Sequence, residues 1–197
     1  MVKVSCVSIK DFFKQLDEDL FIEESSILMV LSNEYCLGRR ALSRRTCISE
    51  RRVREAVSKL IDKGFLTKNN DLCINKDKLE FFTRLCFESF SIDNYILTTI
   101  CCFDSDVLEK IRNNITDLRD HIVISTGKPW VFEIIGIREA NVTVLPKVPK
   151  RIASKYHRFL NKVFNNGSIL VLWKEYKPFI NESILLQGLF KICISSK

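Results

Sequence analysis

The sequence lacks any long hydrophobic run, and it contains few glycines, prolines and histidines. Its longest apolar stretches, such as residues 95–103, are much shorter than the ~20 residues that a membrane-spanning helix needs. The N-terminal residues also lack the basic, then apolar, then small-residue order of a signal peptide. We therefore expect a cytoplasmic protein with no membrane partner.

Motifs for catalysis and metal binding are also missing. His121 and His157 lie in different expected elements, and neither belongs to a nucleophile motif. The segment Thr126-Gly127-Lys128 lacks the preceding glycines of a phosphate-binding loop. No two of the eight cysteines have the C-x-x-C spacing of a zinc site. We expect no enzyme activity, no metal and no cofactor, and we interpret the cysteines as buried thiols, with disulfides as the alternative in a hyperthermophile.

The strongest pattern in the chain covers residues 35–66 and predicts two short helices joined by a tight turn. Ser49 is suited to cap the second helix, and Gly64 is suited to end it in a left-handed conformation. Apolar residues between them follow the spacing of an amphipathic helix: Val53, Ala56, Val57, Leu60 and Ile61. This pattern predicts a helix-turn-helix whose second, recognition helix covers about residues 50–63.

Positive charge is concentrated in the same segment. Residues 38–68 hold ten basic and three acidic residues, whereas residues 1–37 hold three basic and seven acidic ones. A DNA duplex is a dense line of negative charge, and the second helix of a helix-turn-helix lies in its major groove. We therefore predict that double-stranded DNA is a partner, with Arg51, Arg52 or Arg54 pairing with guanine.

A β-hairpin is predicted directly after the recognition helix. Two short apolar strands flank residues 69–71, which are asparagine and aspartate, and these residues tolerate the backbone of tight turns. This hairpin, at about residues 67–76, would contact the DNA backbone as a wing. The predicted DNA-binding residues are Arg39, Arg40, Arg44, Arg45, Ser49, Glu50, Arg51, Arg52, Arg54, Glu55, Ser58, Lys68, Asn69 and Asn70.

Three short segments carry a resemblance to a known family: Leu37-Gly-Arg-Arg-Ala-Leu-Ser, Ile48-Ser-Glu-Arg-Arg-Val-Arg and Leu60-Ile-Asp-Lys-Gly-Phe-Leu. They resemble the winged helix-turn-helix domain of prokaryotic transcriptional regulators. The Leu-Gly-Arg-x-x-Leu opening and the Val53-Arg54 pair are similar to archaeal winged-helix proteins with an uncharacterised C-terminal domain. The turn of that family often contains a glycine, whereas this chain has Cys47. The resemblance covers about the first third of the chain and implies DNA binding.

The remainder of the chain predicts a second domain of a different kind. Residues 77–90 are rich in phenylalanine and predict a helix, which is either a dimerisation helix or the packing link to the next domain. Strands are predicted at residues 95–103, 121–125, 130–136, 141–145 and 169–173, and helices at residues 104–118, 150–164 and 181–193. This order predicts an α+β sandwich whose helices cover one face of a mainly antiparallel sheet.

The predicted domains are therefore residues 1–76, a winged helix-turn-helix with an N-terminal extension, residues 77–90, and residues 91–197, an effector or assembly domain. The helix at 150–164 has a strongly basic face that could bind an anionic effector, extend the DNA footprint, or only solvate the helix. The residues proposed for an anion or effector site are Lys150, Arg151, Lys155 and Arg158. The residues proposed for an aromatic ligand pocket, with a place in the core as the alternative, are Trp130, Tyr156, Trp173 and Tyr176.

The function expected from these patterns is that of a DNA-binding transcriptional regulator. Besides double-stranded DNA, a second copy of the chain and a small-molecule effector are candidate partners. The alternative is a winged-helix module for protein or RNA interactions, without sequence-specific duplex binding. An enzyme in the C-terminal half is a third hypothesis, and the missing catalytic motif weighs against it.

Overall fold

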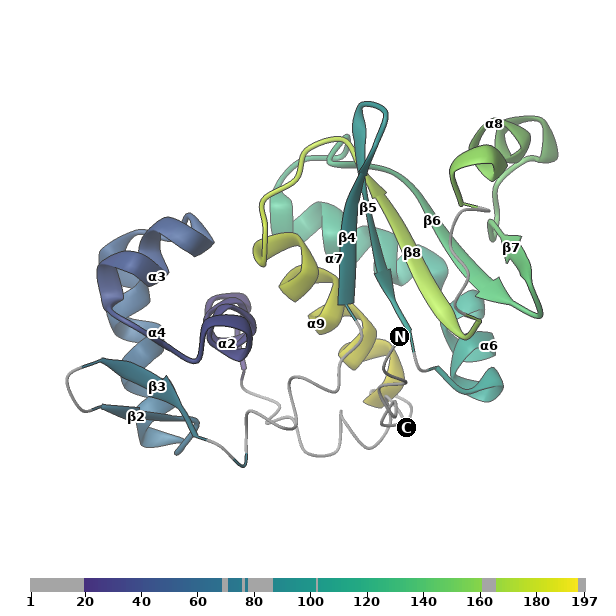
Figure 1. Cartoon of the computed structure of the whole chain (residues 1–197). Coiled ribbons are helices and arrows are strands. Elements are labelled where there is room, and N and C mark those ends of the chain that lie inside the picture. The colour runs from purple at the N-terminus through teal and green to yellow at the C-terminus, as the bar shows by residue number, and fades with distance from the viewer. Residues whose placement is uncertain are drawn as a thin grey trace. The chain divides into compact units, whose positions relative to one another are not determined.

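The computed structural model describes residues 20–68, 71–75, 77, 87–101, 103–160 and 166–194. These residues form seven helices and two antiparallel sheets, which confirms the predicted α+β class (Figure 1). The chain divides into a smaller unit, Lys14–Arg84 with Lys177–Gln187, and a larger unit, Met1–Phe13 with Leu85–Tyr176 and Gly188–Lys197. None of the helices among the described residues has the length and apolar character needed to cross a membrane.

The smaller unit packs three helices against a three-stranded sheet. Its elements are α2 (Ile22–Glu34), β1 (Cys36–Leu37), α3 (Arg39–Thr46), α4 (Glu50–Asp62), β2 (Leu66–Lys68) and β3 (Leu72–Ile74). The strands are antiparallel, in the order β1-β3-β2. The three helices form a closed core because each contributes fully buried side chains, among them Ile27 of α2, Leu42 of α3 and Leu60 of α4.

The structure contains the helix cap and the turn that the sequence predicts around α3 and α4. The side chain of Ser49 caps α4 by accepting a hydrogen bond of 3.5 Å from the backbone N–H of Arg52. Cys47 adopts the left-handed conformation, with φ 56° and ψ 24°, that a glycine would adopt more readily. Gly64 likewise has a positive φ of 70° after the end of α4. The predicted helices, the cap and the following hairpin strands are confirmed.

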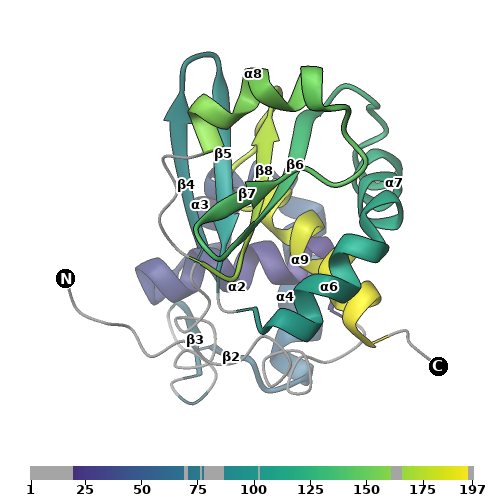
Figure 2. The ribbon, with the colours of Figure 1, turned by 90° about the vertical axis from the view of Figure 1, so that its right-hand side faces the viewer.

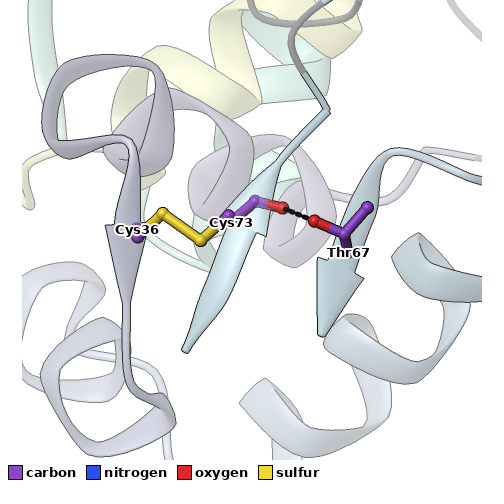
Figure 3. The surroundings of a disulfide bond; sticks show 3 residues. All are labelled: Cys36, Thr67 and Cys73. Carbon is purple, nitrogen blue, oxygen red and sulfur yellow. Dashed lines mark hydrogen bonds between the residues drawn. A yellow bond between two sulfur atoms is a disulfide. The ribbon is translucent and has the colours of Figure 1, made fainter. Parts of the chain in front are cut away.

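A disulfide joins Cys36 of β1 to Cys73 of β3 (Figure 3). The two residues are direct cross-strand partners, and their Cα atoms are 4.1 Å apart. Such a short separation is typical of facing residues in an antiparallel pair. The expectation of buried thiols is therefore wrong for these two cysteines, because strand pairing brings together residues that are 37 positions apart in the sequence. Cys47, Cys101 and Cys193 are not in disulfides.

The larger unit contains a five-stranded antiparallel sheet in the order β4-β5-β8-β6-β7. Its elements are β4 (Phe87–Ile92), β5 (Tyr95–Ile100), α6 (Ser105–Asn113), α7 (Ile115–Thr126), β6 (Phe132–Glu139), β7 (Val142–Val144), α8 (Lys150–Leu160) and β8 (Ser168–Trp173). The last helix, α9 (Ile180–Ile194), contributes its residues up to Gln187 to the smaller unit. There, the hydroxyl of Ser26 on α2 donates to that of Ser183 at 3.0 Å. The sequence pattern assigns these α9 residues to the C-terminal domain.

Helices lie on both faces of the larger sheet. On one face, α8 packs against the sheet through a cluster that includes Ala153 of α8, Ile134 of β6 and Leu172 of β8 (Figure 2). On the other face, Glu139 of β6 forms an ion pair with Arg112 of α6. Residues 134 and 139 point to opposite faces because side chains alternate along a strand. The predicted arrangement, with helices on one face only, is therefore wrong.

Two further predictions for this half are wrong in part. Residues 121–125 form the second half of α7 instead of a strand. The β-branched residues in this segment suggested a strand, but burial of Ile115, Leu118 and Ile122 follows helical spacing. The predicted helix at 77–90 is a strand over residues 87–90, which pair with β5. Residues 78–86 lie outside the described part of the chain.

Candidate nucleic-acid interface

All of the predicted DNA-binding residues that the structure describes are exposed to solvent. They are Arg39, Arg40, Arg44, Arg45, Ser49, Glu50, Arg51, Arg52, Arg54, Glu55, Ser58 and Lys68. Asn69 and Asn70 lie outside the described residues. The structure therefore presents these side chains on the surface of the smaller unit, on α3, on α4 and at the end of β2.

The buried stripe of α4 determines which of its side chains face outwards. Val53, Ala56, Val57 and Leu60 are all buried against the rest of the unit. At about 100° per residue, the side of α4 opposite this stripe carries Arg51, Glu55 and Ser58. Arg54 lies on one flank of that outward side, and Arg52 lies on the other flank with Lys59, because these two are seven residues apart.

The flank that carries Arg52 and Lys59 faces α2. Arg52 forms an ion pair with Glu23, and Lys59 lies 3.4 Å from Glu24, whose side chain is 3% exposed. The ammonium group of Lys59 also lies 4.5 Å from the ring centroid of Phe21, in the geometry of a cation–π contact. These contacts connect α4 to α2. Arg52 therefore has a structural partner that the sequence alone did not indicate.

The other arginines of α4, Arg51 and Arg54, are more available to bind an anion from outside the chain. The side chain of Arg51 is 83% exposed and lies 3.8 Å from Glu55, one turn further along the helix. Exposed pairs of this kind contribute only about 0.3–0.5 kcal/mol to stability, so Arg51 can readily exchange Glu55 for another anion. Arg54 is exposed, and no carboxylate in the described part of the chain forms an ion pair with it. Arg51 and Arg54 both lie in the first two turns of α4.

The arginines of α3 also differ in their partners. Arg45 is bound to Glu34 at 2.9 Å. Arg40 is 85% exposed and lies 4.0 Å from Glu50, the first residue of α4. This distance is the upper limit for an ion pair. The Nε of Arg44 donates to the backbone carbonyl of Arg40 at 3.4 Å and remains exposed. Arg40 therefore adds an exposed positive charge beside the N-terminus of α4.

Three of the four residues proposed for an effector site in the larger unit lie on the surface of α8. Lys150, Arg151 and Lys155 are exposed on α8, and the side chain of Arg158 lies outside the described residues. Among the aromatic residues, Trp173 is fully buried in the core and donates to the hydroxyl of Thr98 at 3.0 Å.

Trp130 and Tyr176 are not among the residues that line the cavity at Tyr156. Trp130 is 57% exposed, and its indole N–H donates to Glu175 at 2.8 Å. Tyr156, in contrast, lines a cavity of about 210 Å³. Arg119 and Lys147 line the same cavity, and sequence analysis did not place these two together in one ligand site because they come from α7 and from the connection after β7.

Three side chains at this cavity interact with one another: Tyr156, Glu133 and Lys174. The Tyr156 hydroxyl donates to Glu133, and the Lys174 ammonium forms an ion pair with the same carboxylate. Burial raises the pKa of Glu133, but the hydrogen bonds from Lys174 and Tyr156 and the charge of Lys174 outweigh it, so the pKa lies below its ordinary value. Burial and the bond to Glu133 raise the pKa of Tyr156 to about 12. At neutral pH Glu133 is therefore a carboxylate, and it accepts from the Tyr156 hydroxyl and the Lys174 ammonium.

Comparison with known proteins supports the fold and leaves the activity open. No protein-family model and no curated protein matches this chain. A solved structure of a hypothetical protein from Pyrococcus horikoshii OT3 is similar, with a TM-score of 0.55 and 18% sequence identity. The match covers 88% of this chain and 94% of that protein. At this identity the similarity concerns the fold, and it extends over both compact units.

Proposed function

We propose that this chain is a DNA-binding transcriptional regulator whose smaller unit is a winged helix-turn-helix domain. The order of its elements, helix, short strand, two helices and a hairpin, supports this proposal, as does the pairing of the short strand with the hairpin. On this assignment α4 is the recognition helix, and β2 and β3 form the wing. The chain would then be a cytoplasmic regulator without enzyme activity.

The observation that carries the proposal is the exposed basic surface at the N-terminal end of α4. In helix-turn-helix proteins, the first residues of the recognition helix contact base edges. Arg51 and Arg54 occupy that part of α4, and Arg40 lies beside it. Arginine pairs with guanine O6 and N7 through two hydrogen bonds. Arg52 and Lys59 would instead hold α4 on α2 through Glu23 and Glu24.

This division of roles gives a direct test. Duplexes selected from a random pool with the full chain would first define a preferred sequence, and half-site spacing would report whether two copies bind together. Fluorescence anisotropy on that sequence would then compare R51A and R54A with K191A, which removes an exposed positive charge from the part of α9 that belongs to the larger unit. We expect each of R51A and R54A to weaken binding by about 1–3 kcal/mol.

The control K191A should bind DNA as the unchanged chain does. R52A should lower the thermal stability of the smaller unit, because it removes the partner of Glu23. It should not relax sequence preference at a single base pair. Unchanged affinity in both R51A and R54A would refute the proposed recognition surface.

One observation favours a second function, a winged-helix module that binds protein or RNA. Arg45 and Arg52 pair with carboxylates of the chain itself, which reduces the charge offered to phosphates. The salt dependence of binding separates the two functions. If Arg39, Arg40 and Arg44 each neutralise one phosphate of a duplex, the slope of log affinity against log salt should be about −3. A slope near zero would favour the protein-binding module.

A further inference from the structure

The cavity in the larger unit lies at the open edge of strand β6. Strand β7 pairs with only three residues of β6, Ile137, Arg138 and Glu139, so the stretch from Phe132 to Gly136 has no outer strand partner among the described residues. The cavity of about 210 Å³ lies there and is lined by both Ile134 and Ile135. Since consecutive residues of a strand point to opposite faces, the cavity wraps around the strand edge.

The walls come from three directions, and their surface is about half apolar and half polar. Ile115 of α7, Ile152 of α8 and Val148 from the connection after β7 surround the strand edge. Two cationic side chains, Arg119 of α7 and Lys147, complete the wall. Apolar walls with a few fixed polar groups are typical of small-molecule sites.

Lys147 is held in an unusual backbone conformation. The amide of Val148 donates to the carbonyl of Leu145 at 3.3 Å, which closes a turn with Pro146 and Lys147 at its centre. Lys147 has a φ of 58° in this turn. Glycine or asparagine is favoured at the third position of such a turn, so the lysine side chain is kept at a conformational cost. Its ammonium group donates to the hydroxyl of Thr116 at 2.9 Å.

The positive charges of the wall are not balanced by acidic residues. Glu133 lines the cavity, but its two oxygens already accept from Tyr156 and bind Lys174. The guanidinium group of Arg119 lies 5.9 Å from the ring centroid of Phe132. Among the described residues, no carboxylate forms an ion pair with Arg119 or Lys147. The site therefore offers two exposed cations beside a group of apolar side chains.

We propose that this cavity binds a small organic monocarboxylate with an apolar body. The carboxylate would be held by Arg119 and Lys147, and the apolar body would lie between the isoleucine side chains. A dry cavity of ~150 Å³ is known to hold benzene, so this one accommodates a ring or a short chain of similar size. The proposal does not depend on DNA binding, because the site belongs to the larger unit alone.

Benzoate is a suitable probe, since it combines a carboxylate with an apolar ring. We expect saturable binding of benzoate to the full chain by isothermal titration calorimetry, and a higher unfolding temperature when the ligand is present. Benzyl alcohol, which keeps the ring and lacks the charge, should bind at least ~10-fold more weakly, because the two cations then gain no partner. Equal affinity for inorganic phosphate and benzoate would overturn the proposal, because it would show that the apolar walls contribute nothing.

Variants of the chain separate the site from general effects of charge. R119Q and K147G should each weaken benzoate binding by ~10-fold or more, whereas K191Q, which removes an exposed charge of α9 outside the cavity, should not. K147G is informative because glycine relieves the left-handed backbone. It should unfold at the same temperature as the unchanged chain or a higher one, so a loss of binding cannot be attributed to misfolding. Benzoate binding that is unchanged in both R119Q and K147G, or absent from the unchanged chain, would refute the proposed site.

Discussion

The disulfide between Cys36 and Cys73 allows a quantitative prediction about the smaller unit. It closes a loop across 37 positions of the sequence, which spans α3, α4 and β2. In the chain-entropy description, a cross-link over a loop of this length stabilises the folded state by about 4 kcal/mol, mainly by restricting the unfolded chain. Measured values are often smaller. We therefore expect the double variant C36S/C73S to lose about 2–4 kcal/mol of unfolding free energy in the smaller unit.

Urea unfolding followed by circular dichroism at 222 nm would measure this loss, because α2, α3 and α4 contribute helical signal. C47S is the matched control, since Cys47 is an exposed cysteine outside the disulfide. It should change the unfolding free energy by less than about 0.5 kcal/mol. Coincident unfolding curves for C36S/C73S and the unchanged chain would refute the reasoning. An equal loss in C47S would show that the effect comes from replacing cysteine and not from removing the cross-link.

Two further predictions concern the larger unit. Gly127 and Gly167 have nearly the same positive φ, 66° and 68°, but an added Cβ would meet open space at Gly127 and the backbone oxygen of Phe103 at 2.7 Å at Gly167. G127A should therefore cost about 1 kcal/mol in thermal denaturation, and G167A clearly more; equal losses would contradict the overlap. For Tyr156, the raised pKa of about 12 means that its contribution to stability is complete below pH 10 and is lost as the pH rises towards 12. Y156F should remove that part of the pH dependence of the unfolding temperature, and an unchanged profile would argue against the bond to Glu133.

The parts of the fold that were predicted correctly are those with a local signal. The apolar stripe of α4, the cap at Ser49 and the hairpin after Gly64 are properties of short segments, and all three are found in the structure. Residues 121–125 had a misleading local signal, since β-branched residues favour strands, whereas packing places them in α7. Prediction from short segments therefore succeeds where the secondary-structure propensity of the residues agrees with their burial in the fold.

The candidate sites depended on tertiary structure to a greater extent. The sequence indicated the basic surface, but Arg52 and Arg54 became distinguishable only when Glu23 of α2 was found beside one of them. The cavity had no sequence signal of its own, because it depends on where β7 stops pairing with β6 and on a turn at Lys147. Both features arise from elements that are distant in the sequence.

The exposed thiol of Cys47 has a practical consequence. It lies in the turn just before α4, whereas Cys101 is buried and Cys36 and Cys73 are oxidised. A maleimide dye should therefore react with Cys47 in preference to these three residues in the native chain. Such a dye would sit next to the proposed recognition helix, where its brightness or rotational freedom would change as nucleic acid arrives, and it would record association in real time.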